Sequence, residues 1–314
     1  MRKKLLSLAL LFLTGWAGMQ AQLLWKISGK GLGAPSYIFG TNHLSPLSVK
    51  DRIAGLDEAL KAATQVCGEI EMAAMTDPAG MQRLQAAMTL PDGKTLKDIL
   101  PAADYAKADS VTTAVMGVGL SLPQLAQLSP SALVTNLTTV LYVKRHPGFN
   151  PMEQLDTYFQ TEAMKAGKKV RGLETLDFQI DVLFGGKTME RQAEELMCFV
   201  NNVEWYAGQT DSLSALYERQ DIEGMLRLTE EKTNTACDPR PEELDRLIYD
   251  RNADWLTKMP AIMAEGTTLF VVGAGHLGGE RGVLALDVTL GDAPEGAYVR
   301  DWSINGVDAT LSVA

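Results

Sequence analysis

The chain has 314 residues, of which 46% are hydrophobic and 22% charged, and its formal net charge is −10. A chain of this length and apolar content can bury a large core, which excludes an intrinsically disordered protein. The acidic balance, without any cluster of Lys and Arg to offset it, argues against nucleic acid as a partner.

Residues 1–21 have the pattern of a secretory signal peptide. Three basic residues are followed by an apolar stretch and by small residues near Ala21, where the signal peptide would be cleaved. No cysteine lies at this position, which argues against a lipid anchor. No later segment reaches the roughly 18 consecutive apolar residues that a membrane span needs. We therefore expect a secreted or periplasmic protein without a membrane span, whose mature chain, residues 22–314, forms a single domain.

The first part of the mature chain predicts a β-hairpin followed by a helix and a strand. Residues 23–27 and 37–40 are short β-like runs on either side of a glycine-rich segment. A helix is predicted from about Val49 to Thr64, and a core strand over residues 65–72. Glu69 and Glu71 are two positions apart in that strand, so the pattern places both carboxylates on one face.

From about residue 77 to 168 the pattern changes to Ala, Leu, Met and Gln at helical spacing, which predicts a large helical insert. A third strand over residues 169–173 then leads into Glu174. Residues 192–259 are again helical, and the most apolar strand covers residues 267–273. A short helix over 282–286 and a strand over 298–303 complete a mixed α/β (α+β) fold with a central, mostly β-sheet core.

Two of the three histidines lie in the same frame, Gly-x-x-His, directly after a strand-like run. These are His43, in GTNH at residues 40–43, and His276, in GAGH at residues 273–276. A strand that stops in small residues places the next polar side chain at the rim of the sheet, so we expect both imidazoles to meet there. His146 precedes Pro and Gly and is interpreted as a turn residue.

Several common sites are excluded by spacing. The GAGHLG sequence at residues 273–278 matches a dinucleotide fingerprint, but no parallel strand with a ribose-binding acid follows it. The chain has neither a Gly-x-Ser-x-Gly elbow nor a His-Glu-x-x-His helix. Imidazoles and carboxylates that converge suit a divalent ion such as Zn, Mn or Co. Glu71 is favoured as the ligand because it lies nearer the strand end, while Glu69 can orient a histidine instead.

The chain has three cysteines, so at most one disulfide can form within it. In an oxidising compartment Cys198 and Cys237 can form a disulfide across the helical part, with Cys67 as a small buried hydrophobe in a strand. Nothing in the apolar surroundings of Cys67 lowers the pKa of its thiol, so a nucleophilic role is not expected.

A set of ordered motifs resembles the TraB/PrgY/GumN family, which includes the Tiki metalloproteases and is more remotely similar to erythromycin esterase and ChaN-like proteins. The motifs are YIFGTNH at 37–43, the strand with Glu69 and Glu71, DTYF at 156–159, GLET at 172–175 with Gln179, Arg251 and Asn252, and VGAGHL at 272–277. The resemblance covers nearly the whole mature chain. It implies an α/β fold with a hydrolytic site, which is metal-dependent in the Tiki branch.

Carried over by motif, the resemblance assigns roles to eight residues. His43, His276 and Glu71 are expected to hold a divalent metal ion. Glu69, Glu174 and Arg251 are expected to be catalytic, although Arg251 can equally form a structural salt bridge to Glu174 or Glu71. Asn42 and Asn252 are expected to bind substrate.

Three functions stay open on the sequence. The first is an extracytoplasmic, metal-dependent hydrolase, with Mn, Co or Zn as the ion and a peptide or protein as the substrate. The second keeps the site without a metal, with His43 as general base in the manner of an esterase. The third is a non-catalytic module that sequesters peptides.

Overall fold

The computed structural model describes residues 22–29, 32–284, 299–304 and 307–313, the last two ranges as backbone. The predicted signal peptide lies outside the described residues, as do residues 285 and 286 of the last predicted helix. Residues 282–284 form turns. None of the described helices combines the length and the apolar character that crossing a bilayer requires.

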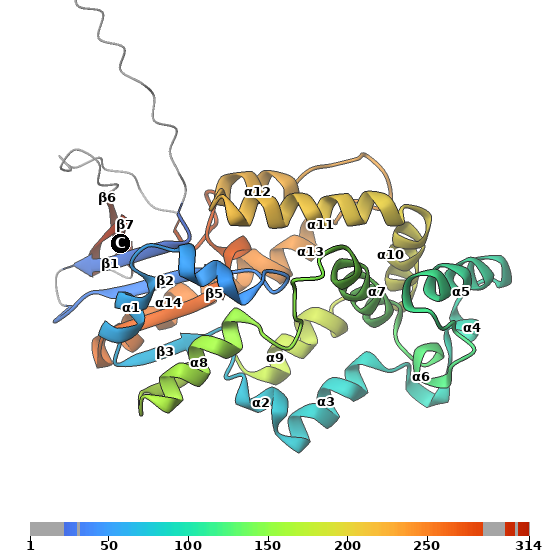
Figure 1. The fold of residues 1–314 in the computed structure, drawn as a ribbon, viewed down its shortest axis with the longest axis horizontal. Helices are drawn as coiled ribbons and strands as arrows, with labels where there is room; N and C mark the ends of the chain where they lie inside the picture. Colours follow the sequence, from blue (N-terminus) through green and yellow to red (C-terminus); the bar gives the residue numbers. More distant parts are fainter. Residues whose placement is uncertain (1–21, 30–31, 285–298, 305–306, 314) are drawn as a thin grey trace, which may run out of the picture.

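A seven-stranded mixed sheet lies at one end of the molecule, in the order β4-β3-β5-β2-β1-β7-β6 (Figure 1). β2, β3, β4 and β5 are parallel, whereas β1, β7 and β6 pair antiparallel at the other side. The sheet confirms the predicted mixed α/β class, including the N-terminal hairpin of β1 and β2. The strands are β1 Leu24–Gly29, β2 Ser36–Thr41, β3 Gln65–Gly68, β4 Lys169–Gly172, β5 Thr268–Gly273, β6 Val299–Ile304 and β7 Val307–Val313.

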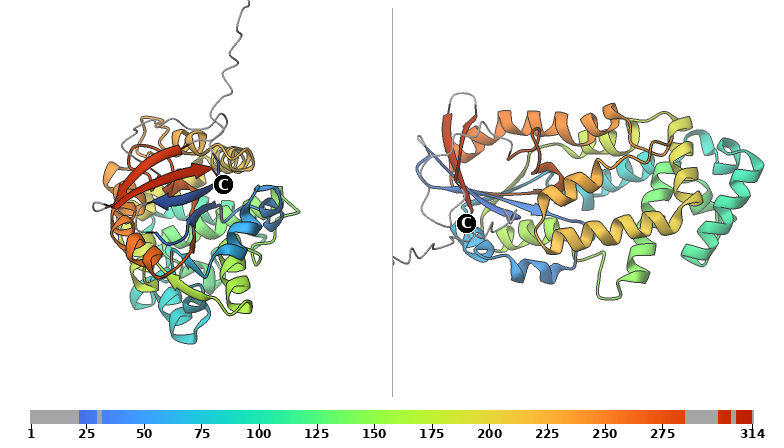
Figure 2. Two further views of the ribbon diagram at one scale, coloured as in Figure 1. Left: turned by 90° about the vertical axis from the view of Figure 1, so that its left-hand side faces the viewer. Right: turned by 90° about the horizontal axis from the view of Figure 1, so that it is seen from above.

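The three inner parallel strands, β2, β3 and β5, are almost entirely buried because helices cover both faces of the sheet, whereas the edge strand β4 is partly exposed. Helix α8 (Leu155–Lys165) and helix α14 (Asp250–Glu265) lie on opposite sides of it (Figure 2). Phe159 of α8 and Trp255 of α14 are both fully buried in the main core. β5, whose first five residues are buried, is the central strand of this region.

The helix predicted from Val49 to Thr64 is wrong as a single element. The chain instead forms a 3-10 helix, η1 (Leu47–Arg52), and a separate helix, α1 (Leu56–Ala62). Gly55 between them has φ of 78°, a left-handed conformation that ends one helical segment before the next begins.

The remaining helices form a layer that extends away from the sheet (Figure 1). Their leucine-rich core joins α7, from the predicted insert, to α10, which follows it in the chain, so two separate segments build this layer. The first segment contains α2 Ala73–Thr76, α3 Pro78–Met88, η2 Pro91–Gly93, α4 Leu96–Ile99, α5 Ala102–Met116, α6 Pro123–Ala126 and α7 Pro130–Arg145. The elements that follow β4 are α9 Leu176–Ile180, η3 Asp181–Gly185, α10 Met189–Asn201, α11 Val203–Glu218, α12 Ile222–Thr229, α13 Pro241–Leu244 and η4 Asp245–Tyr249. The short η5, Ala274–His276, lies at the end of β5 and contacts β2.

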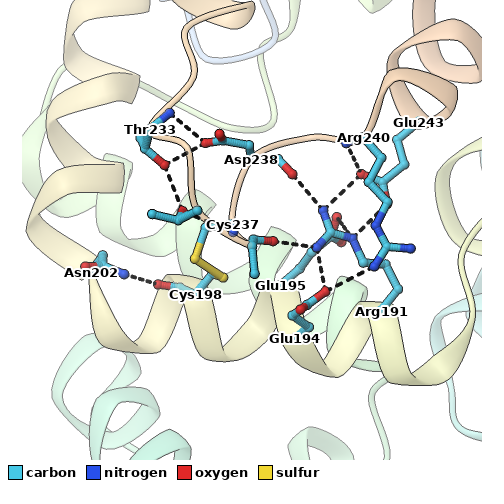
Figure 3. Close-up of a disulfide and its surroundings, with 12 residues drawn as sticks. Arg191, Glu194, Glu195, Cys198, Asn202, Thr233, Cys237, Asp238, Arg240 and Glu243 are labelled. Carbon is cyan, nitrogen blue, oxygen red and sulfur yellow. Dashed lines mark hydrogen bonds and ion pairs between the residues drawn. A yellow bond between two sulfur atoms is a disulfide. The ribbon is translucent and has the colours of Figure 1, made fainter.

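A disulfide between Cys198 and Cys237 fixes the loop after α12 to α10 (Figure 3). Arg191 of α10 also binds this loop, through hydrogen bonds. Its guanidinium donates to the carbonyl oxygens of Ala236 and Asp238, the residues on either side of Cys237, at 2.8 and 3.0 Å. The loop is therefore held both covalently and by hydrogen bonds.

We expect the double variant Cys198→Ser, Cys237→Ser to be less stable than the wild type by about 4 kcal/mol, the loop-entropy value for a bridge of this span. The bridged residues are 39 positions apart, so the cross-link removes many conformations from the unfolded chain. Thermal unfolding with and without dithiothreitol measures the effect. Dithiothreitol should lower the Tm of the wild type and leave that of the double variant unchanged; equal Tm values in all four samples would contradict the prediction.

Candidate functional site

The four parallel strands each deliver a candidate residue at their carboxyl ends. His43 follows β2, Glu69 follows β3, Glu174 follows β4 and His276 follows β5. Because the carboxyl ends of parallel strands share one edge of a sheet, residues more than 200 positions apart meet there. The backbone continues this alignment past the strands, since the amide of Glu174 donates to the carbonyl oxygen of Glu69 at 2.8 Å.

Arg251, on α14, binds both buried glutamates of this edge. Its Nη2 donates to Oε2 of Glu69 at 2.6 Å, and its Nε donates to Oε1 of Glu174 at 2.7 Å. Trp255 adds a hydrogen bond from its indole to Oε1 of Glu174 at 2.6 Å. The predicted pairing of Arg251 with Glu174 is therefore present, whereas the second partner is Glu69, not Glu71. All these groups are nearly inaccessible to solvent.

Glu69 and Glu174 respond differently to this environment. For Glu69, burial alone would raise the pKa, but attraction to His276 and Arg251 lowers it to about 2. Since His276 is itself neutral at neutral pH, the guanidinium is the permanent source of that effect. For Glu174, burial raises the pKa despite the contact with Arg251. The cluster thus holds one firmly ionised carboxylate beside one that ionises less readily.

His276 is held as a neutral imidazole by hydrogen bonds to both ring nitrogens. The Asn252 amide nitrogen donates to the carbonyl oxygens of His276 and Arg281, so the Asn252 oxygen faces Nδ1 of His276 as an acceptor, at 2.7 Å. Nδ1 therefore carries the proton, and Nε2 accepts from Nη1 of Arg251 at 3.1 Å. Burial lowers the pKa of His276 to about 4, with Arg251 acting in the same direction.

His43 differs from the rest of the cluster because its side chain is 60% exposed. Nδ1 of His43 lies 3.2 Å from Oδ2 of Asp156, a buried carboxylate in the first turn of α8. Thr41 donates to the other carboxylate oxygen of Asp156 at 3.0 Å. The negative charge of Asp156, together with this contact, raises the pKa of His43 to about 9.

Glu71, the predicted metal ligand, does not share a face with Glu69. β3 ends at Gly68, and the chain bends over the next residues instead of continuing as a strand. Glu69 turns into the cluster, where it accepts from the amide of Gly273 at 2.8 Å, and Glu71 is exposed. The two-residue periodicity that placed both side chains together applies only while the strand lasts.

The two asparagines predicted to bind substrate have different surroundings. Asn252 uses its whole amide to orient His276 and its loop, so within the described structure it is a positioning residue. Asn42, beside His43, accepts from the amide of Leu44 at 3.0 Å through Oδ1. Its Nδ2 is buried and has no hydrogen-bond partner among the described residues. This donor beside His43 is therefore unused in the described structure.

Two further residues of the site received no role from the sequence. Asp156 pairs with His43, and Gln179 donates to Oε2 of Glu69 at 3.0 Å. Both belong to motifs that carry the family resemblance, which was the available signal. Neither follows a strand, so the argument from strand ends did not find them.

A family model for TraB/PrgY/gumN proteins matches residues 23–291, which is most of the chain. The chain belongs to the TraB/PrgY/gumN family. The membership in this family that the motifs indicated is thereby confirmed. Searches of curated proteins and of solved structures found no match.

As arranged here, the residues of this TraB/PrgY/gumN protein do not fit a divalent metal ion. The Nε2 lone pair of His276 is directed at the guanidinium of Arg251, which would repel a cation placed between them. Glu71 lies outside the cluster, and Nδ1 of His43 is paired with Asp156. Within the described part of the chain, no group of three or more His, Cys, Asp or Glu is placed to hold an ion. The metal stays a prediction from the sequence.

Proposed function

We propose that this protein is a hydrolase that cleaves peptide bonds, with His43 as its general base. One observation carries the proposal: His43 alone among the clustered strand-end residues is exposed, and it rests on a buried carboxylate, that of Asp156. The buried acid orients the imidazole through Nδ1 and leaves Nε2 to accept a proton, which is the arrangement that a general base requires. The resemblance to the Tiki metalloproteases supports a peptide as substrate.

The reaction follows from the positions of these groups. His43 removes a proton from water through Nε2 while the water oxygen forms a bond to the carbonyl carbon of the substrate. Asp156 holds Nδ1 and stabilises the imidazolium that results. The unpaired Nδ2 of Asn42 donates a hydrogen bond to the carbonyl oxygen as it gains negative charge. The imidazolium then returns the proton to the leaving nitrogen as the carbon–nitrogen bond breaks.

Arg251 and its two glutamates act as positioning residues in this proposal. By joining Glu69 after β3 to Glu174 after β4, and by contacting His276 after β5, Arg251 holds three strand ends in fixed relation. The rigid edge that results supports the segment carrying His43.

We expect kcat/KM for peptide cleavage to rise with pH and to level off above about 9, because a general base must be unprotonated and Asp156 raises the pKa of His43 to about 9. In Asp156→Asn the main source of that shift is gone, so the inflection should move down towards the ordinary value of 6.5. A pH profile of both proteins measures this. An identical inflection in the two proteins would contradict the assignment of His43 as the base.

The metal-dependent route expected from the sequence needs a direct test as well, although the described residues, as arranged, do not fit an ion. Elemental analysis of purified protein and activity before and after EDTA separate the two routes. Unchanged activity in protein without metal favours the metal-free route, whereas loss that Zn, Mn or Co restores favours the other.

We also propose an extracytoplasmic location, either secreted or periplasmic. The leader-like composition of residues 1–21 and the Cys198–Cys237 disulfide both support it, since such bridges persist in oxidising compartments. Fractionation of cells that express the full chain, with the mature N-terminus sequenced, tests the proposal.

A further inference from the structure

A groove of about 450 Å³ lies between α11 and the loop that follows α12, and it shares no lining residue with the strand-end cluster. One wall is a single face of α11, formed by Trp205, Tyr206, Gln209, Thr210 and Leu213, together with Asn202 at the N-cap of the helix. The other wall begins with Leu228 and Thr229 at the end of α12 and continues along the loop to Pro239. The disulfide partner Cys237 lies in this second wall, so the anchored loop in Figure 3 is one side of the groove.

The length of the groove suits a short extended chain. The lining runs from Asn202, the N-cap of α11, to Leu213, which at 1.5 Å per residue is about 16 Å. An extended peptide advances about 3.3 Å per residue, so the groove accommodates roughly five residues. The side-chain amide of Gln209 has no partner among the described residues and is free to bond a peptide backbone.

The lining also defines the side chains that such a peptide should carry. Leu213, Leu228 and the rings of Trp205 and Tyr206 make the groove apolar, and Trp205 is 45% exposed. A large aromatic left exposed in a groove is typical of a binding site. The pocket therefore favours a bulky apolar side chain.

The charges in the groove are of one sign. Glu231 and Asp238 line it, and its described lining contains no Lys, Arg or His. Hydrogen bonds from Thr233 lower the pKa of Asp238, which keeps that carboxylate ionised. The exposed face of Trp205 attracts cations as well. A basic side chain next to the bulky apolar side chain of the peptide would therefore be attracted by the two carboxylates and by the ring of Trp205.

We propose that this groove binds an extended peptide segment in which bulky apolar residues are flanked by Lys or Arg. The Cys198–Cys237 bridge and the hydrogen bonds of Arg191 hold the loop wall in place before binding, which lowers the entropy lost when a ligand binds. The site is separate from the strand-end cluster, and the proposal does not rest on peptide cleavage there.

The test uses fluorescence anisotropy with fluorescein-labelled Lys-Leu-Phe-Leu-Lys, in the full chain carrying His43→Ala so that no cleavage intervenes. Saturable binding is expected for this peptide but not for Glu-Leu-Phe-Leu-Glu or Lys-Ser-Ser-Ser-Lys. Glu231→Lys should weaken binding about fivefold or more, because the new lysine repels the lysines of the peptide. Trp205→Ala should weaken it about tenfold.

The control is Glu58→Lys, the same charge change at an exposed position of α1 outside the groove, which should alter the Kd by less than about twofold. Circular dichroism of each variant checks that it is folded, and Glu231→Lys tests the proposal if Trp205→Ala fails to fold. The proposal is overturned if no peptide binds, if the acidic peptide binds equally well, or if Glu231→Lys and Glu58→Lys behave alike. None of these outcomes depends on whether the wild type cleaves peptides.

Discussion

Replacing His43 with Ala should lower kcat/KM for peptide cleavage by roughly 100- to 10,000-fold, the range that a general base contributes. The side chain is exposed, so its removal leaves no cavity in the core, but the buried carboxylate of Asp156 loses its cation, and a modest shift of the unfolding midpoint to lower urea is expected. Initial rates on a quenched fluorescent peptide library, together with urea unfolding, provide the two measurements. Loss of cleavage in a variant that is still folded under the assay conditions is the expected combination.

The chain contains a matched control for this variant. His146, at the end of α7, also pairs with an aspartate: its Nε2 lies 2.8 Å from Oδ1 of Asp211. It is partly exposed, as His43 is, but it does not follow a strand of the sheet. His146→Ala should retain full activity. Equal losses in the two variants would show that a His–Asp pair matters only for stability, and undiminished cleavage in His43→Ala would rule His43 out as the base.

Replacing Arg251 with Met should destabilise the protein by about 3 to 5 kcal/mol, because Glu69 and Glu174 would then be buried without a cation. Methionine fills much of the space, so the loss reports mainly on charge. Urea unfolding at pH 7 measures it. Arg52→Ala is the control, since that arginine forms only an exposed ion pair with Glu218 at 3.5 Å and should cost less than about 1 kcal/mol.

The dependence on pH distinguishes lost charge pairing from lost packing. In the wild type the pKa of Glu69 is about 2, below its usual 4.5, so its ionised form contributes stability above pH 4.5 that disappears as the pH falls through about 2. Without Arg251 the buried carboxyl is better tolerated when protonated. The difference between Arg251→Met and the wild type should therefore shrink from pH 7 to pH 4. A difference that is constant over this range would indicate packing alone.

The convergence of the strand-end residues could be predicted because it depends on local patterns. Apolar runs that stop in small residues predict strand ends, and parallel strands bring their ends together regardless of distance in the chain. His276 and Glu174 were found in this way. The expectation that Glu69 and Glu71 share a face was wrong because it required the strand end to within two residues, and β3 stops at Gly68.

The partners that the sequence did not provide are set by tertiary packing. Asp156 reaches His43 only because α8 lies against the sheet, a position that no pattern within the helix specifies. The same holds for the contact of Arg251 with His276, which depends on where α14 lies. That contact alters the chemistry expected at the site, because it occupies the nitrogen that a metal would need.

The order of the strands determines when the sheet can be completed. β5 lies between β3 and β2, yet its residues, Thr268–Gly273, follow those of both neighbours by more than 190 positions. Until that segment has been synthesised, the inner edges of β2 and β3 have unpaired backbone groups and no common partner. Folding of the sheet must therefore wait for the last part of the chain and cannot proceed from the N-terminus strand by strand.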